Sequence, residues 1–210
     1  SDMAYIGAGF GAGVHSVIEP AVYGCVVSFG PNIQLLDEAV EMTEKNTSEP
    51  NPTEAELRSL AAELIQKQSV VTLATSAKDQ AWAAPVYYVY HKSGFCFFSD
   101  PGTRHVSEAL EGGQASASVH APSFDWREIR GLQMSGRVEH VSGKIEALGI
   151  IGAYLKKFSF IEEFFTPGND LDMAAFESRF RVKLYKFTPS LAYYLDNKIR
   201  FGFREEVSLE

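Results

Sequence analysis

Apolar and polar residues alternate in several short stretches after residue 70, and this pattern predicts a body built mainly of β-strands. The stretch 70–75 is rich in β-branched residues, and the long aromatic stretch 81–90 is joined by the turn Lys92-Ser93-Gly94 to a third strand over 95–99. Further strands are predicted over 115–120, 132–141, 180–187 and 191–195. About seven strands are enough for a small closed barrel.

Three other stretches have apolar residues at helical spacing. Thr53 and Glu56 form a capping box in front of the first, and its apolar stripe is Leu57, Leu60, Ala61, Leu64 and Ile65. A short helix is predicted to be capped by Thr103 and to end at Gly112-Gly113. The third covers about 144–157, with Ile145, Leu148, Ile151 and Leu155 on one side.

Residues 1–47 differ from the rest of the chain, because they carry six acidic residues and a single lysine. Their pattern predicts strands over 4–6 and 25–29 and helices over about 15–23 and 34–45, which is too little to close a core. The polar stretch 48–52 contains two prolines and is interpreted as a linker. We therefore predict a truncated αβ segment over 1–47 and a main domain over 53–210.

Composition and charge exclude several classes of function for this chain. The chain of 210 residues has a formal net charge of −8, so binding to nucleic acid or to an anionic membrane would work against its own field. Two cysteines without a pairing pattern favour a reducing compartment, and no signal peptide or membrane span is recognisable. We expect a cytoplasmic protein. Its histidines show no metal-ligand spacing, so no metal site is predicted.

The glycine-rich loop of the first segment, Gly7-x-Gly9-x-x-Ala12, fits a relaxed dinucleotide-binding pattern, but the acidic residue expected about 20 residues later is missing. By pattern alone a structural turn is the favoured interpretation. The string from Ala4 to Gly24, with Phe29-Gly30-Pro31-Asn32 after it, resembles the donor-side domain of bacterial 3-deoxy-manno-octulosonic acid transferases. It has Ser16 where that family usually has Asn, and the acceptor domain is absent. We expect a fragment without sugar transfer, with Glu19 as the residue to watch.

A second constellation runs from Phe97 through Ser99-Asp100-Pro101-Gly102 to Thr103-Arg104-His105. It leads from the end of a strand into a helix N-terminus and gathers hydroxyls, a guanidinium, an imidazole and backbone N–H groups, all of which favour a small anion such as a phosphate. For an isolated Thr-Arg pair, a helix cap and a solvated surface charge are the simpler interpretation.

The strand pair, the hairpin, this turn and the later string Arg130-Gly131-Leu132-Gln133 through Glu139 resemble the FMN-binding split-barrel family typified by pyridoxamine 5′-phosphate oxidase, over about 140 residues. A subgroup of small, uncharacterised bacterial members is most similar. The resemblance implies an α+β fold that is mainly β with flanking helices, a split β-barrel, and a homodimer that holds FMN at its interface. The implied FMN-binding residues are Pro85, Val86, Tyr87, Tyr88, Ser99, Thr103, Arg104, His105, Arg130 and Gln133.

The sequence also departs from the oxidase. It has Val89 where the oxidase has a substrate-binding Lys, Gly131 where the oxidase has a Gln, and His105 where a Lys is usual. Because of Val89 and Gly131, pyridoxamine phosphate is not the substrate that we expect. At His105, an imidazole carries less charge than an ammonium at neutral pH. We predict an FMN-dependent oxidoreductase acting on another small molecule. The alternatives are a ligand-binding module without turnover and, for residues 1–47, an inactive remnant that serves as an interaction surface.

Overall fold

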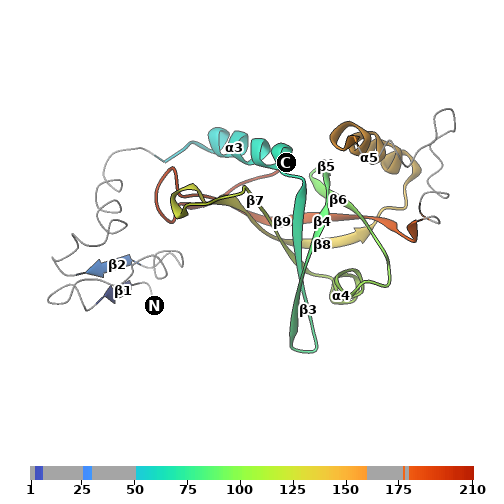
Figure 1. Cartoon of the computed structure of the whole chain (residues 1–210), viewed down its shortest axis with the longest axis horizontal. Helices are drawn as coiled ribbons and strands as arrows, with labels where there is room; N and C mark the ends of the chain where they lie inside the picture. Colours follow the sequence, from blue (N-terminus) through green and yellow to red (C-terminus); the bar gives the residue numbers. More distant parts are fainter. Residues whose placement is uncertain (1–2, 7–25, 30–50, 160–176, 178–179) are drawn as a thin grey trace.

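The computed structural model describes residues 3–6, 26–29, 51–159, 177 and 180–210. Its main body is an antiparallel eight-stranded sheet in the order β4–β3–β7–β8–β9–β6–β5, with β10 beside β9 (Figure 1). The sheet curls into a half-barrel whose concave side holds the main core. The strands are β3 (Val70–Ala77), β4 (Gln80–Tyr87), β5 (Val89–His91), β6 (Gly94–Ser99), β7 (Ala115–His120), β8 (Arg130–His140), β9 (Lys183–Asp196) and β10 (Arg204–Glu206).

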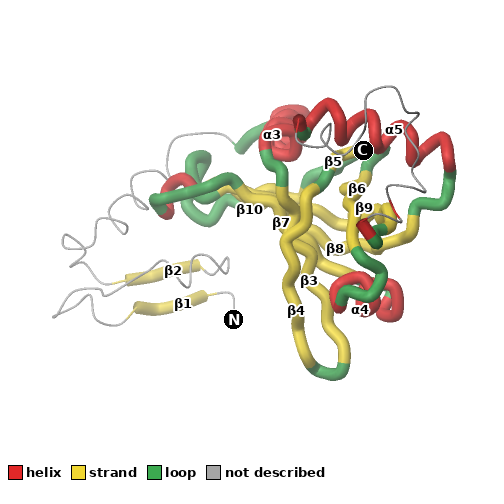
Figure 2. The backbone as a smooth tube through the Cα atoms, turned by 45° about the vertical axis from the view of Figure 1, so that its right-hand side comes forward, coloured by secondary structure: helices red, strands yellow, loops and turns green. Residues whose placement is uncertain are grey.

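Three α-helices flank the strands: α3 (Glu54–Lys67), α4 (Arg104–Gly112) and α5 (Lys144–Lys157). Figures 1 and 2 show α4 at the opposite end of the strands from α3 and α5. The capping box of α3 is present, with Thr53 and Glu56 bonded to each other's backbone amides, and its predicted apolar stripe is buried or partly buried. None of the described helices has the length and apolar character needed to cross a membrane.

Two clusters of buried side chains make up the described core. The larger one fills the half-barrel between α3, α4 and the strands, and its largest fully buried members are Tyr88, Tyr185, Tyr194, Phe95, Phe97, Phe187 and Phe203. The smaller one lies under α5 and consists of Val89, Cys96, Ile150, Tyr154, Phe158 and Leu184. Apolar burial of this kind is the main source of folding free energy, so both helical flanks are fixed by the sheet that they cover.

Tyr88 lies where the chain passes from one edge of the sheet to the other. The sequence predicted one strand over 81–90, but the structure has β4 and β5 with Tyr88 between them. The Tyr88 amide donates to Ser69 O at 3.1 Å, and its hydroxyl donates to Ile65 O at 2.8 Å. The side chain is fully buried. The prediction of a single strand was wrong because the apolar run continues through the corner, where a buried tyrosine replaces strand pairing.

Two tight turns have left-handed residues without glycine. Lys78 and Asp79 join β3 to β4 with φ values of 52° and 59°, and Lys92 and Ser93 join β5 to β6 with φ values of 45° and 56°. Positive φ at both central positions is the geometry of hairpin turns whose twist matches that of the strands.

Strand β9 is longer than predicted, because the two strands expected over 180–187 and 191–195 form one continuous element. Its pairing with β8 shifts register between Ser135 and Gly136, opposite Pro189. A side chain at 136 would have no room, since a Cβ there would lie 2.2 Å from Thr188 O. The proline therefore occupies an irregularity within the strand rather than ending it.

The buried face of α5 differs from the apolar side predicted for it. Ile150, Ile151 and Tyr154 are buried, whereas Ile145 and Leu148 are 87% and 55% exposed. The buried side chains of α5 pack against Val89, Cys96 and Leu184 of β5, β6 and β9, and its first turn contacts the sheet through the ion pair of Glu146 with Lys186.

In the first segment the structure describes two strands, β1 (Met3–Ile6) and β2 (Val26–Phe29), which pair in parallel. Both predicted strands are thus confirmed. The predicted helices over 15–23 and 34–45, the glycine-rich loop and most of the linker lie outside the described residues.

Candidate functional site

The turn between β6 and α4 brings three of the predicted site residues together. Ser99 ends β6, and its hydroxyl lies 2.9 Å from Nε2 of His105 and 3.2 Å from Oγ1 of Thr103. The Thr103 hydroxyl donates to Asp100 O at 2.7 Å. Hydrogen bonds among its own hydroxyl, imidazole and carbonyl groups therefore hold this loop in place.

His105 points into the protein from the first turn of α4. The residue is 8% exposed, and burial lowers the pKa of its imidazole. The ring is therefore neutral at pH 7, and its Nε2 is occupied by Ser99. In this position the imidazole supports the turn from within.

The N-terminus of α4 is not capped by a side chain, although Thr103 occupies the cap position. The prediction that Thr103 caps the helix was wrong in this respect, because its hydroxyl bonds to Asp100 O instead. Within the described part of the chain, no side chain accepts a hydrogen bond from the amides of Arg104, His105 or Val106. Free amides at a helix N-terminus carry partial positive charge and favour an anion.

Arg104 lies beside this terminus and faces the β3–β4 hairpin. Its Nε donates to Glu108 at 2.5 Å, a terminal nitrogen donates to Gln80 O at 3.3 Å, and the guanidinium carbon lies 4.9 Å from the centre of the Trp82 ring. These contacts fix the direction of the guanidinium. A hollow of about 310 Å³ lies next to it, and Lys78 lines the same hollow.

Glu108 is the residue of this region that the sequence analysis missed. Its second oxygen accepts from the buried hydroxyl of Thr75 at 2.6 Å, and this bond together with Arg104 lowers the pKa of the carboxyl group. A signal was available, because Arg104 and Glu108 are four residues apart on one helix face. Thr75 gave none, since it comes from a distant strand.

The other predicted residues lie apart from this turn. Pro85, Tyr87 and Gln133 are exposed on the convex face of the sheet, where a hollow of about 360 Å³ is lined by Gln133, Thr72, Ser118 and Tyr193 among others. In the pairing of β3 with β4, Val70 lies opposite Tyr87 and Thr72 lies opposite Pro85, so Thr72 lies on the same face as Pro85 and Tyr87.

Three predicted residues face elsewhere. Tyr88 is fully buried, and Val86 packs against the main core. Arg130 begins β8 at the other end of the sheet, where its charge acts on Glu63 of α3 and on Tyr194. The structure thus brings together Ser99, Thr103, Arg104 and His105, places Pro85, Tyr87 and Gln133 on one face, and separates the rest.

Two of the three departures from the oxidase, Val89 and Gly131, are built into the fold. Val89 belongs to the buried cluster under α5, so an apolar side chain stands where the oxidase has an amine. A Cβ at position 131 would lie 2.8 Å from Val119 O, so a glutamine there does not fit this backbone.

The turn can hold a phosphate group. Three free amides lie at the N-terminus of α4, and the Arg104 guanidinium lies beside the helix on the side of the β3–β4 hairpin. Backbone amides and guanidinium groups are donors that phosphate recognition uses. The internally bonded His105 does not add a charge. The residues present therefore fit the phosphate of a flavin nucleotide through Arg104 and the backbone.

Comparisons with known proteins agree with this architecture. A UPF0306 protein of Klebsiella pneumoniae (strain 342) is 27% identical over 140 residues, covering 66% of this chain and 84% of that protein. A UPF0306 protein of Photorhabdus laumondii is 27% identical over 82 residues, covering 38% of this chain and 57% of its own length.

Solved structures share the fold at low identity. A heme-binding protein from Mycobacterium smegmatis superposes with a TM-score of 0.55 at 16% identity, covering 76% of this chain and 60% of its own. A conserved hypothetical protein from Mycobacterium tuberculosis gives a TM-score of 0.55 at 12% identity, covering 71% of this chain and 88% of its own.

The family model described as pyridoxamine 5′-phosphate oxidase matches residues 57–179. This range includes the β3–β4 pair, the β6–α4 turn and strand β8, which follows the loop around Trp126. The predicted α+β split barrel is thereby confirmed, and the chain belongs to the pyridoxamine 5′-phosphate oxidase family.

Proposed function

We propose that the protein binds FMN and serves as a flavin-dependent oxidoreductase for a small organic molecule other than pyridoxamine phosphate, in the cytoplasm. The observation that carries this proposal is the uncapped N-terminus of α4 beside Arg104. Family membership supplies the reason to expect a flavin nucleotide at this turn. Two features argue against the oxidase's own substrate: Val89 is buried, and position 131 has no room for a side chain.

In this proposal the chain's own residues bind and orient the nucleotide. Arg104 donates to the phosphate while Glu108 and the Trp82 ring hold its guanidinium in place. The hydroxyl of Ser99 and the ring of His105 keep the turn in the conformation that presents its amides. The bound flavin would supply the transfer of electrons, and the protein would supply binding and orientation.

The flavin ring would lie along β4. Among the described strands β4 is paired only with β3, so its outer edge has no strand partner, and Pro85 and Tyr87 are exposed on it. An edge strand with an apolar face is a surface that a second chain usually covers. A homodimer is therefore part of the proposal, with the convex face of β4, β3, β7, β8 and β9 as its interface.

A ligand titration tests the cofactor. Flavin-free protein is titrated with FMN, with riboflavin and with FAD, and binding is followed by quenching of flavin fluorescence. FMN is expected to bind at least tenfold more tightly than riboflavin, which has the same ring without the phosphate. Equal binding of FMN and riboflavin would remove the phosphate site from the proposal. Preferential binding of heme, visible as a Soret band, would replace the flavin altogether.

Turnover is tested on the FMN-loaded protein. Oxidation of reduced nicotinamide in the presence of small electron acceptors supports an oxidoreductase, whereas a tightly bound flavin that is not reduced supports a binding module. The dimer is tested by sedimentation of the full chain and of Tyr87→Asp, which places a charge on the convex face. The charged variant is expected to shift toward the monomer, while Leu110→Asp, an exposed position on α4, is not.

Residues 1–47 complete the proposal as an appended segment similar to part of a glycosyltransferase, without transferase activity. The two described strands support only the predicted strands of that segment. The full chain is expected not to bind a cytidine nucleotide. Saturable binding of cytidine monophosphate in a calorimetric titration would overturn this part.

A further inference from the structure

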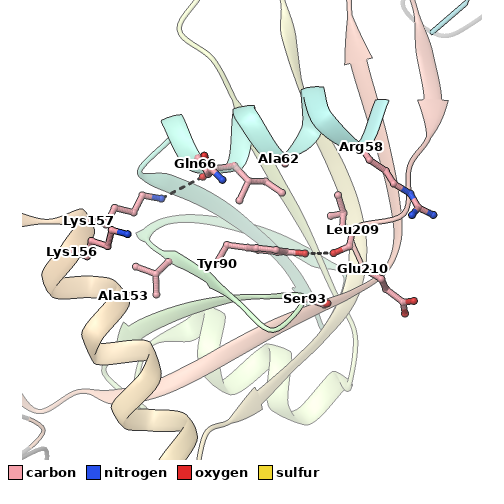
Figure 3. A pocket seen from close by; sticks show the side chains of 12 residues that line it. Arg58, Ala62, Gln66, Tyr90, Ser93, Ala153, Lys156, Lys157, Leu209 and Glu210 are labelled. Atoms are coloured by element: carbon pink, nitrogen blue, oxygen red, sulfur yellow. Dashed lines mark hydrogen bonds between the residues drawn. The ribbon is translucent and has the colours of Figure 1, made fainter. Parts of the chain in front are cut away.

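A second pocket lies far from the β6–α4 turn, between α3, α5, β5 and the end of the chain. Its volume is about 720 Å³. Figure 3 shows the Tyr90 ring along its floor, α3 with Ala62 and Gln66 on one side, and α5 with Ala153 on another. Ligand pockets in proteins have volumes of roughly 300–1,000 Å³. The space is therefore large enough for a small molecule.

Most of the lining is apolar. The Tyr90 hydroxyl donates to Leu209 O, so the ring is held flat between the two helices. The apolar lining residues are Ala62, Ile65, Val89, Tyr90, Ala153 and Leu209. Burial of an apolar group against this wall would be favourable in proportion to the area covered.

The charges of the pocket are divided between its two ends. Lys156 and Lys157 lie together at the α5 end, and Arg58 and Glu210 lie at the other (Figure 3). Arg58 is bonded to Glu54 at 2.6 Å, so its charge is matched within α3. Neither lysine forms an ion pair with a described residue, and Lys156 has no hydrogen bond within the described part of the chain.

Lys157 is held in an unusual environment for an amine. Its Nζ donates to Gln68 O at 2.6 Å and lies 3.5 Å from Ile65 O and 4.0 Å from the centre of the Tyr88 ring. These partners are neutral, and burial lowers the pKa of the amine to about 8. A bound anion would supply the missing negative charge and favour the charged amine.

We propose that this pocket binds a small amphipathic carboxylate, whose anionic group lies at Lys156 and Lys157 and whose apolar chain lies over Tyr90. The two lysine amines are the favoured place for a carboxylate in this pocket, because the rest of the lining offers few hydrogen-bond donors. The site is separate from the proposed flavin site, so it constitutes a second ligand site on the same chain.

The probe is decanoate, with decyltrimethylammonium as a ligand of the same chain length and opposite charge. Both are titrated below their micellar concentrations into the ¹⁵N-labelled full chain at pH 7. Decanoate is expected to bind at least tenfold more tightly and to shift the amide signals of Ala62, Val89 and Ala153. Equal affinity of the two ligands, no saturable decanoate binding, or shifts confined to the convex sheet face would each overturn the proposal.

Two variants locate the ligand within the pocket. Lys156→Gln is expected to weaken decanoate binding at least threefold, whereas Lys144→Gln, at the other end of α5, leaves it unchanged. Ala153→Phe fills the apolar part without changing charge and is expected to abolish binding. Unchanged decanoate binding in Ala153→Phe contradicts the proposal, provided that its amide spectrum remains folded. Arg104→Ala is expected to leave decanoate binding intact, which separates this site from the flavin proposal.

Discussion

Arg104 and Lys157 are both cations held against an aromatic ring, yet their surroundings differ. The Arg104 guanidinium lies 4.9 Å from the centre of the Trp82 ring and is paired with Glu108, which is itself bonded to Thr75. The Lys157 amine lies 4.0 Å from the centre of the Tyr88 ring, and its hydrogen-bond partners among the described residues are backbone carbonyls. A carboxylate partner fixes direction and compensates charge, whereas carbonyls fix position and leave the charge uncompensated.

Burial lowers the pKa of Lys157, and an ion pair with a carboxylate would oppose this lowering. A chain with net charge −8 has many carboxylates, but none of those in the described residues pairs with this amine. The regions around Arg104 and Lys157 therefore differ in how each would bind an anion. At α4 a bound anion would interact with an arginine that is already oriented and with the helix amides. At α5 it would lie beside an amine that has no carboxylate partner among the described residues.

The largest expected effect concerns the paired cation. Arg104→Ala should remove a charge-assisted contact of roughly 1.5 to 3 kcal/mol, and so weaken FMN binding by about ten- to a hundredfold. Fluorescence titration measures the change, with Arg58→Ala on α3 as the control. An unchanged dissociation constant would reduce Arg104 to a residue that only anchors the hairpin.

The second prediction tests how α5, the helix that carries Lys157, is attached to the sheet. The Tyr154 hydroxyl lies 2.8 Å from Tyr87 O and 2.9 Å from Cys96 O. Tyr154→Phe leaves buried carbonyls without this donor and should lower the free energy of unfolding by about 2 kcal/mol. Urea denaturation checks this value. Tyr193→Phe, which is partly exposed, is the control and should change stability by less than about 0.5 kcal/mol.

The third prediction tests the support behind Arg104. Thr75→Val keeps the shape of a buried side chain and removes its hydrogen bond to Glu108, so the free energy of unfolding should fall by about 1 kcal/mol. Thr72→Val, on the opposite face of the same strand, is the matched control and should be close to neutral. Equal effects of both substitutions in urea denaturation would show that the Thr75 hydroxyl has no special role.

The smallest effect concerns pH. His105 is buried and its pKa is lowered, so the unfolded chain binds a proton at a higher pH than the folded chain does. Its contribution to stability is full above the unfolded value of about 6.5 and is lost as the pH falls through the lower folded value. The free energy of unfolding should therefore decrease on acidification from pH 7 to 5. His105→Gln should flatten this dependence, and an identical slope in wild type and variant would contradict it.

Local signals in the sequence were sufficient for much of the fold. The capping box of Thr53 and Glu56, the glycine end of α4 and the alternation in β8 all depend on residues close in sequence, and each is found in the structure. Gly113 has a φ of 65°, which is the left-handed conformation that ends helices.

Features that depend on distant partners were not predictable in the same way. The corner at Tyr88 is stabilised by hydrogen bonds to the backbone carbonyls of Ser69 and Ile65. The face of α5 that is buried depends on the strands against which the helix packs. The same limit applies to the site. The local string indicated Ser99, Thr103 and Arg104, but only the folded chain turns His105 inward and brings Thr75 to Glu108.

Both tryptophans of the chain lie beneath arginines: Arg104 lies over Trp82, and Arg127 lies 4.6 Å from the centre of the Trp126 ring. The protein therefore has a built-in optical reporter. In Trp126→Phe the remaining indole lies at the proposed phosphate-binding arginine, so any displacement of that guanidinium would change its emission. Because flavins absorb where indoles emit, the same ring would also transfer energy to a flavin bound nearby, and one fluorescence trace would record both the movement of the arginine and the arrival of the cofactor.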